Sequence, residues 1–395
     1  MKYLEPAERT GNITPFVVMD VMEKSREMES KGIDVVHLEV GEPDFSTPGC
    51  VKTRILDALE SGETSYTHSL GDIRLRRAIA EYYDRTYSVM VNPGNIIVTS
   101  GTSPAMMLLF MAMINPGDEV IISDPHYVCY PNFIKFAQGV PVTVPVYEKD
   151  AFQYTPQAIS EKITSKTKAI LVNSPSNPTG NVMPRETMEE IVSLAHSNEI
   201  AVISDEIYHG LVYSGTAPSI LETDKDAFVF NGFSKLFAMT GLRLGYLIVP
   251  DNFIRPIQIF HQNFFICANS VIQLAGIAAL TESESEITEM RETYNRRRLY
   301  MIKRLKGMGL GITVEPTGAF YLFANARHIS MDSSALAMEI LESAHVAVTP
   351  GIAFGNNGEG YLRFSYANSM ENIEKGMDRM EEWLTKRDGV RKSLC

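Results

Sequence analysis

Residues that could do chemistry follow several short apolar runs of the sequence. The string SGTSP (residues 100–104) comes after the run Ile96–Thr99 and opens a helical stretch. A glycine, hydroxyl groups and free backbone amides at a helix N-terminus make an anion site, although an ordinary capped helix uses the same residue types. The string NSPSNPTG (residues 173–180) follows the run Ala169–Asn173 and has the proline and glycine of a simple turn. Both strings therefore have a structural as well as a chemical interpretation.

Four charged residues also stand out by their positions. Asp205 and Lys235 each follow an apolar run, where an aspartate can cap the next turn and a lysine is usually solvated. Arg243 lies between glycines in TGLRLGY, which places its guanidinium in crowded backbone. Arg363 lies inside the apolar run YLRFS, where a structural ion pair is the alternative. Because ligands of open α/β sheets bind where strands end, these residues are candidates for one site.

The order of the strings is more specific than any one of them. In chain order they are DPHYVCY, NSPSNPTG, SDEIYHGLVY, FSKLFAMTGLRLGY and YLRFSYA. This series resembles the class I/II aminotransferase family, the aspartate-aminotransferase-like enzymes of fold type I that use pyridoxal 5′-phosphate. The resemblance runs from about Ile33 to the C-terminus, and SK…GLRLGY is its most specific piece. It implies amino-group transfer between an L-amino acid and a 2-oxo acid by a ping-pong mechanism.

The resemblance implies a role for each residue around the cofactor ring. Lys235 matches the Schiff-base lysine, whose amine moves the α-proton after substrate displaces it and therefore needs a depressed pKa. Asp205 matches the carboxylate that keeps the ring nitrogen protonated, so that the ring can accept electrons. Asn177 and Tyr208 match the two donors to the phenolic oxygen, and Tyr127 matches the aromatic residue that stacks on the ring. Lys235, Asp205 and Tyr208 are the predicted catalytic residues.

The resemblance also implies a phosphate cradle and a homodimer. The cradle is matched by Gly101, Thr102 and Arg243. Family members often carry serine three residues before the lysine as a phosphate ligand, but that position is Gly232 here, and Ser234 is the nearby hydroxyl. Tyr66 matches a tyrosine that reaches the phosphate of the neighbouring subunit, so active sites shared across a homodimer are expected.

Substrate binding is implied for three residues. Arg363 matches the clamp on the α-carboxylate, with Gly41 and Asn177 contacting the substrate as well. Members of this branch that accept aspartate often place lysine two positions after the cradle glycine, where this chain has Ser103. The N-terminal segment that faces this region, residues 16–18, is the apolar string FVV. We therefore expect apolar or aromatic amino acids to react better than aspartate.

Other functions use the same machinery or lack support in the sequence. A β-eliminating C–S lyase and a cyclopropane-forming synthase of the same fold remain open, because function depends on the site rather than the fold. A non-catalytic, pyridoxal-phosphate-binding regulator is the alternative of another class, but the chain has no basic N-terminal arm or spare domain. No metal site is expected, because the eight histidines show no ligand spacing.

The elements that must position these residues form an α/β pattern. Helical stretches are expected at 71–87, 103–114, 184–198 and 255–280. Apolar strands between them are expected at 96–99, 119–123, 169–173, 201–204, 227–230 and 244–249. Because these strands are apolar throughout, we expect a mostly parallel sheet covered by helices on both faces.

A smaller α+β domain is expected from the change of texture after about residue 285. A long charged helix (287–306) precedes strands at 312–314, 319–324 and 361–365 and helices at 332–345 and 370–386. The N-terminal part, with a helix ending at Lys31-Gly32, joins this domain. The predicted divisions are an N-terminal segment (1–45), a large cofactor-binding domain (46–285) and a small domain (286–395).

Composition favours a cytoplasmic protein without a nucleic-acid or membrane partner, and the resemblance implies an amino acid and a 2-oxo acid as its small-molecule partners. The net charge of −12 argues against a nucleic-acid or anionic-membrane partner. The four cysteines are scattered without CxxC spacing, as expected of reduced thiols. The first ten residues contain no apolar signal core, and no apolar run reaches membrane length.

Overall fold

The computed structural model describes residues 5–15 and 17–394, and its largest element is a seven-stranded sheet. The strand order is β2-β8-β7-β6-β5-β3-β4. β8 pairs antiparallel with β2 and β7, whereas the other neighbours pair parallel. The strands are β2 (Ile96–Thr99), β3 (Glu119–Asp124), β4 (Val140–Pro145), β5 (Thr167–Asn173), β6 (Ala201–Asp205), β7 (Phe228–Gly232) and β8 (Gly245–Ile248). The mostly parallel sheet confirms the predicted α/β class.

Helices cover both faces of this sheet, because alternate residues of each strand point to opposite sides. Ile170 and Val172 of β5 belong to one buried cluster, whereas Ala169 and Leu171 belong to a second. Residues of α2, α3, α7 and α9 join the first cluster, and residues of α4, α5 and α8 join the second. These helices are α2 (Gly49–Glu60), α3 (Ile73–Tyr87), α4 (Thr102–Met113), α5 (Tyr130–Phe136), α7 (Arg185–Ser197), α8 (Asp251–Phe264) and α9 (Ser270–Glu282). Two buried faces explain why the strands are apolar throughout.

A smaller part of the molecule joins C-terminal elements to an N-terminal helix and strand, whereas Thr14, which precedes that helix, hydrogen-bonds to Asn132 of α5 beside the large sheet. β12 (Tyr361–Ser365) pairs antiparallel with β9 (Tyr321–Asn325) and β11 (Thr349–Pro350). β1 (Val36–His37) pairs parallel with β10 (Val346–Ala347), so the N-terminal segment joins the C-terminal part. The helices of this part are α1 (Val17–Ser30), α10 (Glu284–Gly307), α11 (Ser333–Ala344) and α12 (Met370–Leu394).

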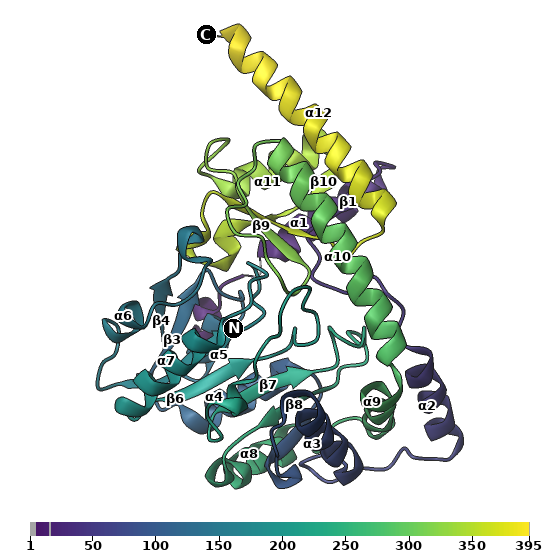
Figure 1. Cartoon of the computed structure of the whole chain (residues 1–395), viewed down its shortest axis with the longest axis vertical. Coiled ribbons are helices and arrows are strands. Elements are labelled where there is room, and N and C mark those ends of the chain that lie inside the picture. Colours follow the sequence, from purple (N-terminus) through teal and green to yellow (C-terminus); the bar gives the residue numbers. More distant parts are fainter. Residues whose placement is uncertain (1–4, 16, 395) are drawn as a thin grey trace.

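The long helix α10 runs between the two parts. In Figure 1 it leads from the neighbourhood of α2 and α9, beside the large sheet, to α12 at the top. It contacts both α12 and β9. Two short helices complete the elements used below, α6 (Pro156–Ser160) and the 3₁₀ helix η4 (Ile220–Glu222). This layout matches the expected organisation, while the exact divisions at residues 45 and 285 stay predictions.

Three sequence-based expectations differ from the structure. The single helix expected at 255–280 is two helices, α8 and α9, because Ile266 takes a left-handed φ of 66° and Asn269 caps a new helix. The strand expected at 312–314 is not formed; next to it, Gly311 makes only an isolated bridge to Asn325. The edge strand β4 was not predicted, because its two prolines and largely solvent-accessible residues obscure the strand pattern.

The lengths and compositions of the described helices decide whether any of them could cross a membrane. None of those in residues 5–15 and 17–394 is long and apolar enough to cross a membrane. The cytoplasmic location stays a prediction.

Candidate active site

One pocket gathers most of the residues that the sequence predicts. It lies where β5, β6 and β7 end, next to the first turn of α4 and to the middle of β12. The predicted residues that line it are Gly41, Thr102, Tyr127, Asn177, Asp205, Tyr208, Ser234, Lys235, Arg243 and Arg363. Segments that are hundreds of residues apart in sequence therefore meet at one edge of the sheet, as expected for an open α/β fold.

Lys235 follows β7 and extends its amine into the pocket. Its Nζ donates a hydrogen bond to the carbonyl oxygen of Gly41 at 2.7 Å. Burial lowers the pKa of Lys235 to about 8. A substantial fraction of the amine is therefore neutral slightly above pH 7, the form that acts as a nucleophile or base.

Asp205 ends β6 as a buried carboxylate. The Tyr130 hydroxyl donates to its Oδ2 at 2.6 Å, and the backbone amide of Ile207 donates to Oδ1 at 3.2 Å. Burial raises the pKa of Asp205 to about 6. No described lysine or arginine forms an ion pair with this carboxylate. A buried acid that faces a pocket and has no ion-pair partner there is suited to a ligand that brings a proton or a positive charge.

Tyr208 and Asn177 present polar groups from two different loops. The hydroxyl of Tyr208 is 2.8 Å from the hydroxyl of Tyr321. The Asn177 backbone amide donates to Asn173 Oδ1 at 2.9 Å, and its own Oδ1 accepts from Arg363 Nη1 at 3.0 Å. The side-chain NH2 of Asn177 is left to donate to a ligand, together with the Tyr208 hydroxyl.

The start of α4 and Arg243 form a compact anion cradle. Gly101 precedes α4 with a φ of 93° and no side-chain cap, so the first amides of the helix are open to an anion. A Cβ at Gly101 would lie 2.5 Å from Arg243 Nη2, so only glycine lets the guanidinium approach this closely. Arg243 Nη1 donates to the Thr240 carbonyl at 2.9 Å, which fixes the fork beside the helix start.

Arg363 is a buried cation whose hydrogen-bond partners among the described residues are neutral groups. Besides Asn177, its guanidinium donates to the Thr349 hydroxyl at 3.2 Å and to the backbone carbonyl of Glu39. It lies 4.4 Å from the ring centroid of Tyr321, and its Nε has no hydrogen-bond partner among the described residues. None of the described carboxylates forms an ion pair with it, so the structural ion pair considered from the sequence is not formed. A buried cation in this state is suited to an anionic ligand.

Three further predicted positions lie differently. Gly232 packs against β8, where a Cβ would be 3.0 Å from the Cα of Gly245, so this position has little room for a serine. Ser234, which is 9% exposed, is the hydroxyl that lines the pocket instead. Tyr66 lies outside this pocket and is 80% exposed, an unusual state for a tyrosine on a single chain.

Sequence reasoning missed several residues of the pocket. Tyr130 belongs to the DPHYVCY string and lies three residues after Tyr127, so its position on the following helix was the available signal. Tyr321 carried no such signal, because only the pairing of β9 with β12 brings it next to Arg363. The remaining missed residues of the lining include Met19, Met22, Val40, Glu42 and Met106.

Comparison with known proteins identifies this arrangement. The family described as aminotransferase class I and II matches residues 33–380. The chain belongs to this family. A Methanocaldococcus jannaschii (5-formylfuran-3-yl)methyl phosphate transaminase is 42% identical, with 96% of this chain and all of the relative covered. Aromatic-amino-acid aminotransferase 2 of Thermococcus litoralis is 38% identical, with coverages of 90% and 93%.

The fold agrees with solved aminotransferase structures. A double mutant of Thermus thermophilus aspartate aminotransferase has a TM-score of 0.92 and 37% identity, with 96% of this chain and 100% of that chain covered. The chain is therefore an aminotransferase that depends on pyridoxal 5′-phosphate.

The donors of the pocket fit this cofactor. The Gly101 cradle and Arg243 suit a phosphate, and the buried Asp205 suits a ring nitrogen that carries a proton. Lys235 supplies an amine of lowered pKa between them. When bound, pyridoxal phosphate supplies an electron-withdrawing ring that stabilises negative charge at the substrate α-carbon.

Proposed function

We propose that this aminotransferase moves the amino group of an apolar or aromatic L-amino acid to a 2-oxo acid, in preference to that of aspartate. The reaction is ping-pong, and Lys235 would hold the cofactor covalently before the first half-reaction and after the second. Lys235 also moves the proton at the substrate α-carbon, for which its burial and pKa of about 8 are suited. Arg363 binds the α-carboxylate that every amino acid has, so the choice of substrate depends on what meets the side chain.

The other pocket residues take roles around the cofactor in this proposal. Asp205, oriented by the Tyr130 hydroxyl, holds the ring nitrogen protonated. Asn177 and Tyr208 donate to the phenolic oxygen, and Tyr127 stacks on the ring. The phosphate is held by Gly101, Thr102, Ser234 and Arg243, with Tyr66 from the neighbouring subunit. The fit of the donor set to each group supports these roles.

The observation that carries the substrate preference is the distribution of charge in the pocket. Among the described residues that line it, the cations are Lys235, Arg243 and Arg363. Each of these has a task with the cofactor or the α-carboxylate in this proposal. Glu42 also lines the pocket and is an acid. The second carboxylate of aspartate would have to be buried without a cation of its own, which costs several kcal/mol.

The remaining wall of the pocket is apolar. Met19 and Met22 of α1 line it together with Val40 and with Met106 of α4, while Ser103 occupies the position of the aspartate-binding lysine. Methionine is flexible and polarisable, so it adapts to apolar and aromatic side chains. Of the sequence string FVV, Phe16 and the side chains of its two valines lie outside the described residues.

A half-reaction screen tests this preference. The holoenzyme is mixed with alanine, leucine, phenylalanine, tyrosine, glutamate or aspartate, and kcat/KM is measured from the change in cofactor absorbance. The side chains of leucine and aspartate branch at the same atom, so their ratio compares an apolar with a charged group of similar branching. We expect leucine, phenylalanine or tyrosine to exceed aspartate by about tenfold or more, the equivalent of about 1.4 kcal/mol. A clear preference for aspartate over all the others contradicts the proposal.

The choice of acceptor needs a separate assay. With a preferred donor, product is measured with 2-oxoglutarate, with pyruvate and with no acceptor. A requirement for a 2-oxo acid is expected, whereas ammonia released without an acceptor would indicate the lyase alternative. Because one relative is named for a furan aldehyde phosphate, an aldehyde phosphate is included as a third acceptor. Faster turnover with that aldehyde than with either 2-oxo acid would replace the proposed acceptor.

Tyr66 supports the proposal of a homodimer with shared active sites. Its side chain is 80% exposed beside a hollow that also contains Thr67, His68 and Arg76. Mixing inactive Tyr66→Ala chains with inactive Lys235→Ala chains should restore activity, because each hybrid dimer then has one intact site. A fully active monomer, or mixtures that stay inactive, would contradict this arrangement.

A further inference from the structure

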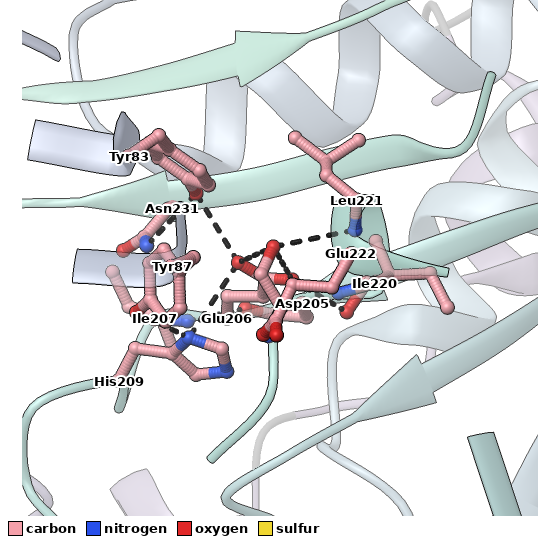
Figure 2. A network of polar contacts seen from close by, with 12 residues as sticks. Tyr83, Tyr87, Asp205, Glu206, Ile207, His209, Ile220, Leu221, Glu222 and Asn231 are labelled. Carbon is pink, nitrogen blue, oxygen red and sulfur yellow. Dashed lines mark hydrogen bonds and ion pairs between the residues drawn. The ribbon is translucent and has the colours of Figure 1, made fainter. Parts of the chain in front are cut away.

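Glu206 follows Asp205 in the chain but points away from the pocket. Its side chain is fully buried, with 0% exposure, and it is not among the residues that line the pocket. Neighbouring residues of an extended segment point to opposite sides. Asp205 therefore reaches Tyr130 of α5, whereas Glu206 reaches Tyr83 of α3. Figure 2 shows the Glu206 carboxyl group at the centre of a network of polar contacts on this reverse side.

Both carboxyl oxygens of Glu206 accept hydrogen bonds from separate elements. The backbone amide of Ile220 in η4 donates to Oε1 at 2.9 Å, and the Ser219 hydroxyl donates to the same oxygen at 3.0 Å. The Tyr83 hydroxyl donates to Oε2 at 3.2 Å, and the side-chain amide of Asn231 in β7 donates to Tyr83 at 3.4 Å. The network thus connects α3, η4 and β7 to one side chain.

No described lysine or arginine pairs with Glu206. The base beside it is His209, whose Nδ1 lies 3.5 Å from Oε2 and 2.8 Å from the Tyr87 hydroxyl. Burial lowers the pKa of His209 to about 4, so the imidazole is neutral near pH 7. Burial raises the pKa of Glu206 to about 7. Because well-packed apolar side chains often stabilise a fold as much as a buried polar cluster does, stability alone does not explain this network.

The network holds the turn that carries two pocket residues. The backbone amide of Glu206 donates to the Phe230 carbonyl at 2.8 Å, and its carbonyl accepts from the His209 amide at 2.9 Å. Asp205 lies immediately before this residue and Tyr208 lies two positions after it, and both face the pocket. The side chain of Glu206 thus fixes the turn from behind while its neighbours point forward.

We propose that Glu206 is a positioning residue for the transamination reaction. Through its hydrogen bonds it fixes the direction of the Asp205 carboxylate and the Tyr208 hydroxyl. Its negative charge, next to Asp205, also favours the protonated form of the bound cofactor. The inference rests on the proposed function, because it presumes that Asp205 and Tyr208 contact the cofactor ring.

Several titratable groups lie near Glu206, and their charges affect its ionisation. They are Tyr82, Tyr83 and Tyr87 of α3, Tyr246 of β8, Asp205 and His209 of its own segment, and Glu222 of η4. Burial raises the pKa of each of the four tyrosines, so these stay neutral hydroxyl groups near pH 7. Glu206 and Asp205 are therefore the groups whose charge changes closest to the cofactor on this side.

The test compares Glu206→Gln with two further variants. Glu206→Gln keeps the volume of the side chain. It replaces one carboxyl oxygen, which accepts hydrogen bonds, with an NH2 group that faces other hydrogen-bond donors. Tyr83→Phe removes one hydroxyl group, which donates to Glu206 and accepts from Asn231, and is the safer variant for folding. Val202→Ala is the matched control, because Val202 is a buried apolar residue of β6 in the same cluster and has no polar group in the network. Four quantities are measured for each: Tm of the apoprotein, Kd for pyridoxal phosphate, the pH midpoint of the absorbance change of the bound cofactor, and kcat with KM.

A positioning role predicts a pattern that lost stability does not produce. Glu206→Gln should lower kcat by about 10- to 100-fold while KM for the amino acid changes little, weaken cofactor binding and move the absorbance midpoint to lower pH. Tyr83→Phe should move the midpoint in the same direction by less. Val202→Ala should lower Tm and leave the midpoint and kcat near the wild-type values.

Two results would contradict the positioning role of Glu206. Unchanged midpoints in both network variants, or an equal shift in Val202→Ala, would make Glu206 a structural residue only. If Glu206→Gln does not fold, the midpoint of Tyr83→Phe decides alone. Failure of the proposed function is a different outcome, because the wild-type protein itself would then prefer aspartate as donor or hold the cofactor on a residue other than Lys235.

Discussion

The two ends of the active-site pocket are built in different ways. At the cofactor end, Asp205 and Lys235 are attached to the ends of neighbouring sheet strands, and described hydrogen bonds fix each of them. At the end that we propose receives the substrate side chain, Met19 and Met22 come from α1, which belongs to another part of the molecule. Met19 is 38% exposed and carries no polar group to fix it.

The difference separates the chemistry from the choice of substrate. A sheet edge holds charged groups in fixed directions, which transition-state stabilisation requires. Methionines on a peripheral helix give an adaptable surface, which discriminates less sharply between apolar side chains. Changes at the cofactor end should therefore cost activity with every substrate, whereas changes at the apolar end should alter the ratio between substrates.

The largest effect is expected at Lys235. Lys235→Ala removes both the attachment point of the cofactor and the group that moves the α-proton, so multiple turnover should fall below detection with all amino acids. Steady-state assays with leucine and aspartate measure this, and Lys162→Ala, a change at an exposed lysine, is the control. Turnover that persists in Lys235→Ala would place the chemistry elsewhere.

A smaller but still general loss is expected at Asp205. In Asp205→Asn the amide no longer holds the ring nitrogen protonated, an electrostatic effect of about 3 kcal/mol or more. The variant should still bind pyridoxal phosphate, yet kcat should fall by about a hundredfold or more for every donor. Asp226→Asn, at an exposed aspartate, is the control for general effects. Near-normal turnover would reduce Asp205 to a cap of the turn that follows β6.

Arg363 should show its effect mainly in substrate binding. Arg363→Lys keeps a charge but loses the planar fork that binds a carboxylate with two hydrogen bonds. Loss of one charged hydrogen bond costs about 1.5–3 kcal/mol, so KM for every amino acid should rise by about tenfold or more. Because the α-carboxylate is common to all donors, the leucine-to-aspartate ratio should stay constant. A change in that ratio would show that Arg363 also contacts the side chain.

The smallest effect is expected at the apolar end, and it should appear only in the ratio. Ser103→Lys places a cation at the position where the family resemblance leads us to expect lysine in members that accept aspartate. The kcat/KM ratio of aspartate to leucine should rise by about tenfold, the equivalent of about 1.4 kcal/mol. Ser103→Ala, which changes the polarity without adding a charge, should leave the ratio unchanged. Equal losses for both substrates in Ser103→Lys would mean that this end does not set the preference.

How much the sequence could predict follows the same division. Lys235 and Asp205 could be predicted because their strings, in order with the others, resemble the aminotransferase family, whereas their positions after apolar strands left structural alternatives open. Tyr321 could not, because its contact with Arg363 depends on the pairing of β9 with β12. Met22 could not either, because an amphipathic helix shows an apolar face without showing what that face contacts.

The fold shows the same limit. The strands of the large sheet were predictable from continuous apolar runs, whereas the half-exposed edge strand β4 was not. The break between α8 and α9 depends on Ile266, which has a left-handed backbone conformation. Glycine is the usual residue in that conformation, so an isoleucine gives no signal of it in the sequence. Local patterns thus identify buried elements, while tertiary packing decides edges and breaks.

The position of the cofactor is the central claim, and peptide mapping tests it most directly. The holoenzyme is reduced with borohydride, which makes the bond between pyridoxal phosphate and the protein permanent, then digested and analysed by mass spectrometry. We predict one modified peptide, with the adduct on Lys235 of the string FSKLFAMTGLR. An adduct on another lysine, or none at all, would contradict the account of the pocket.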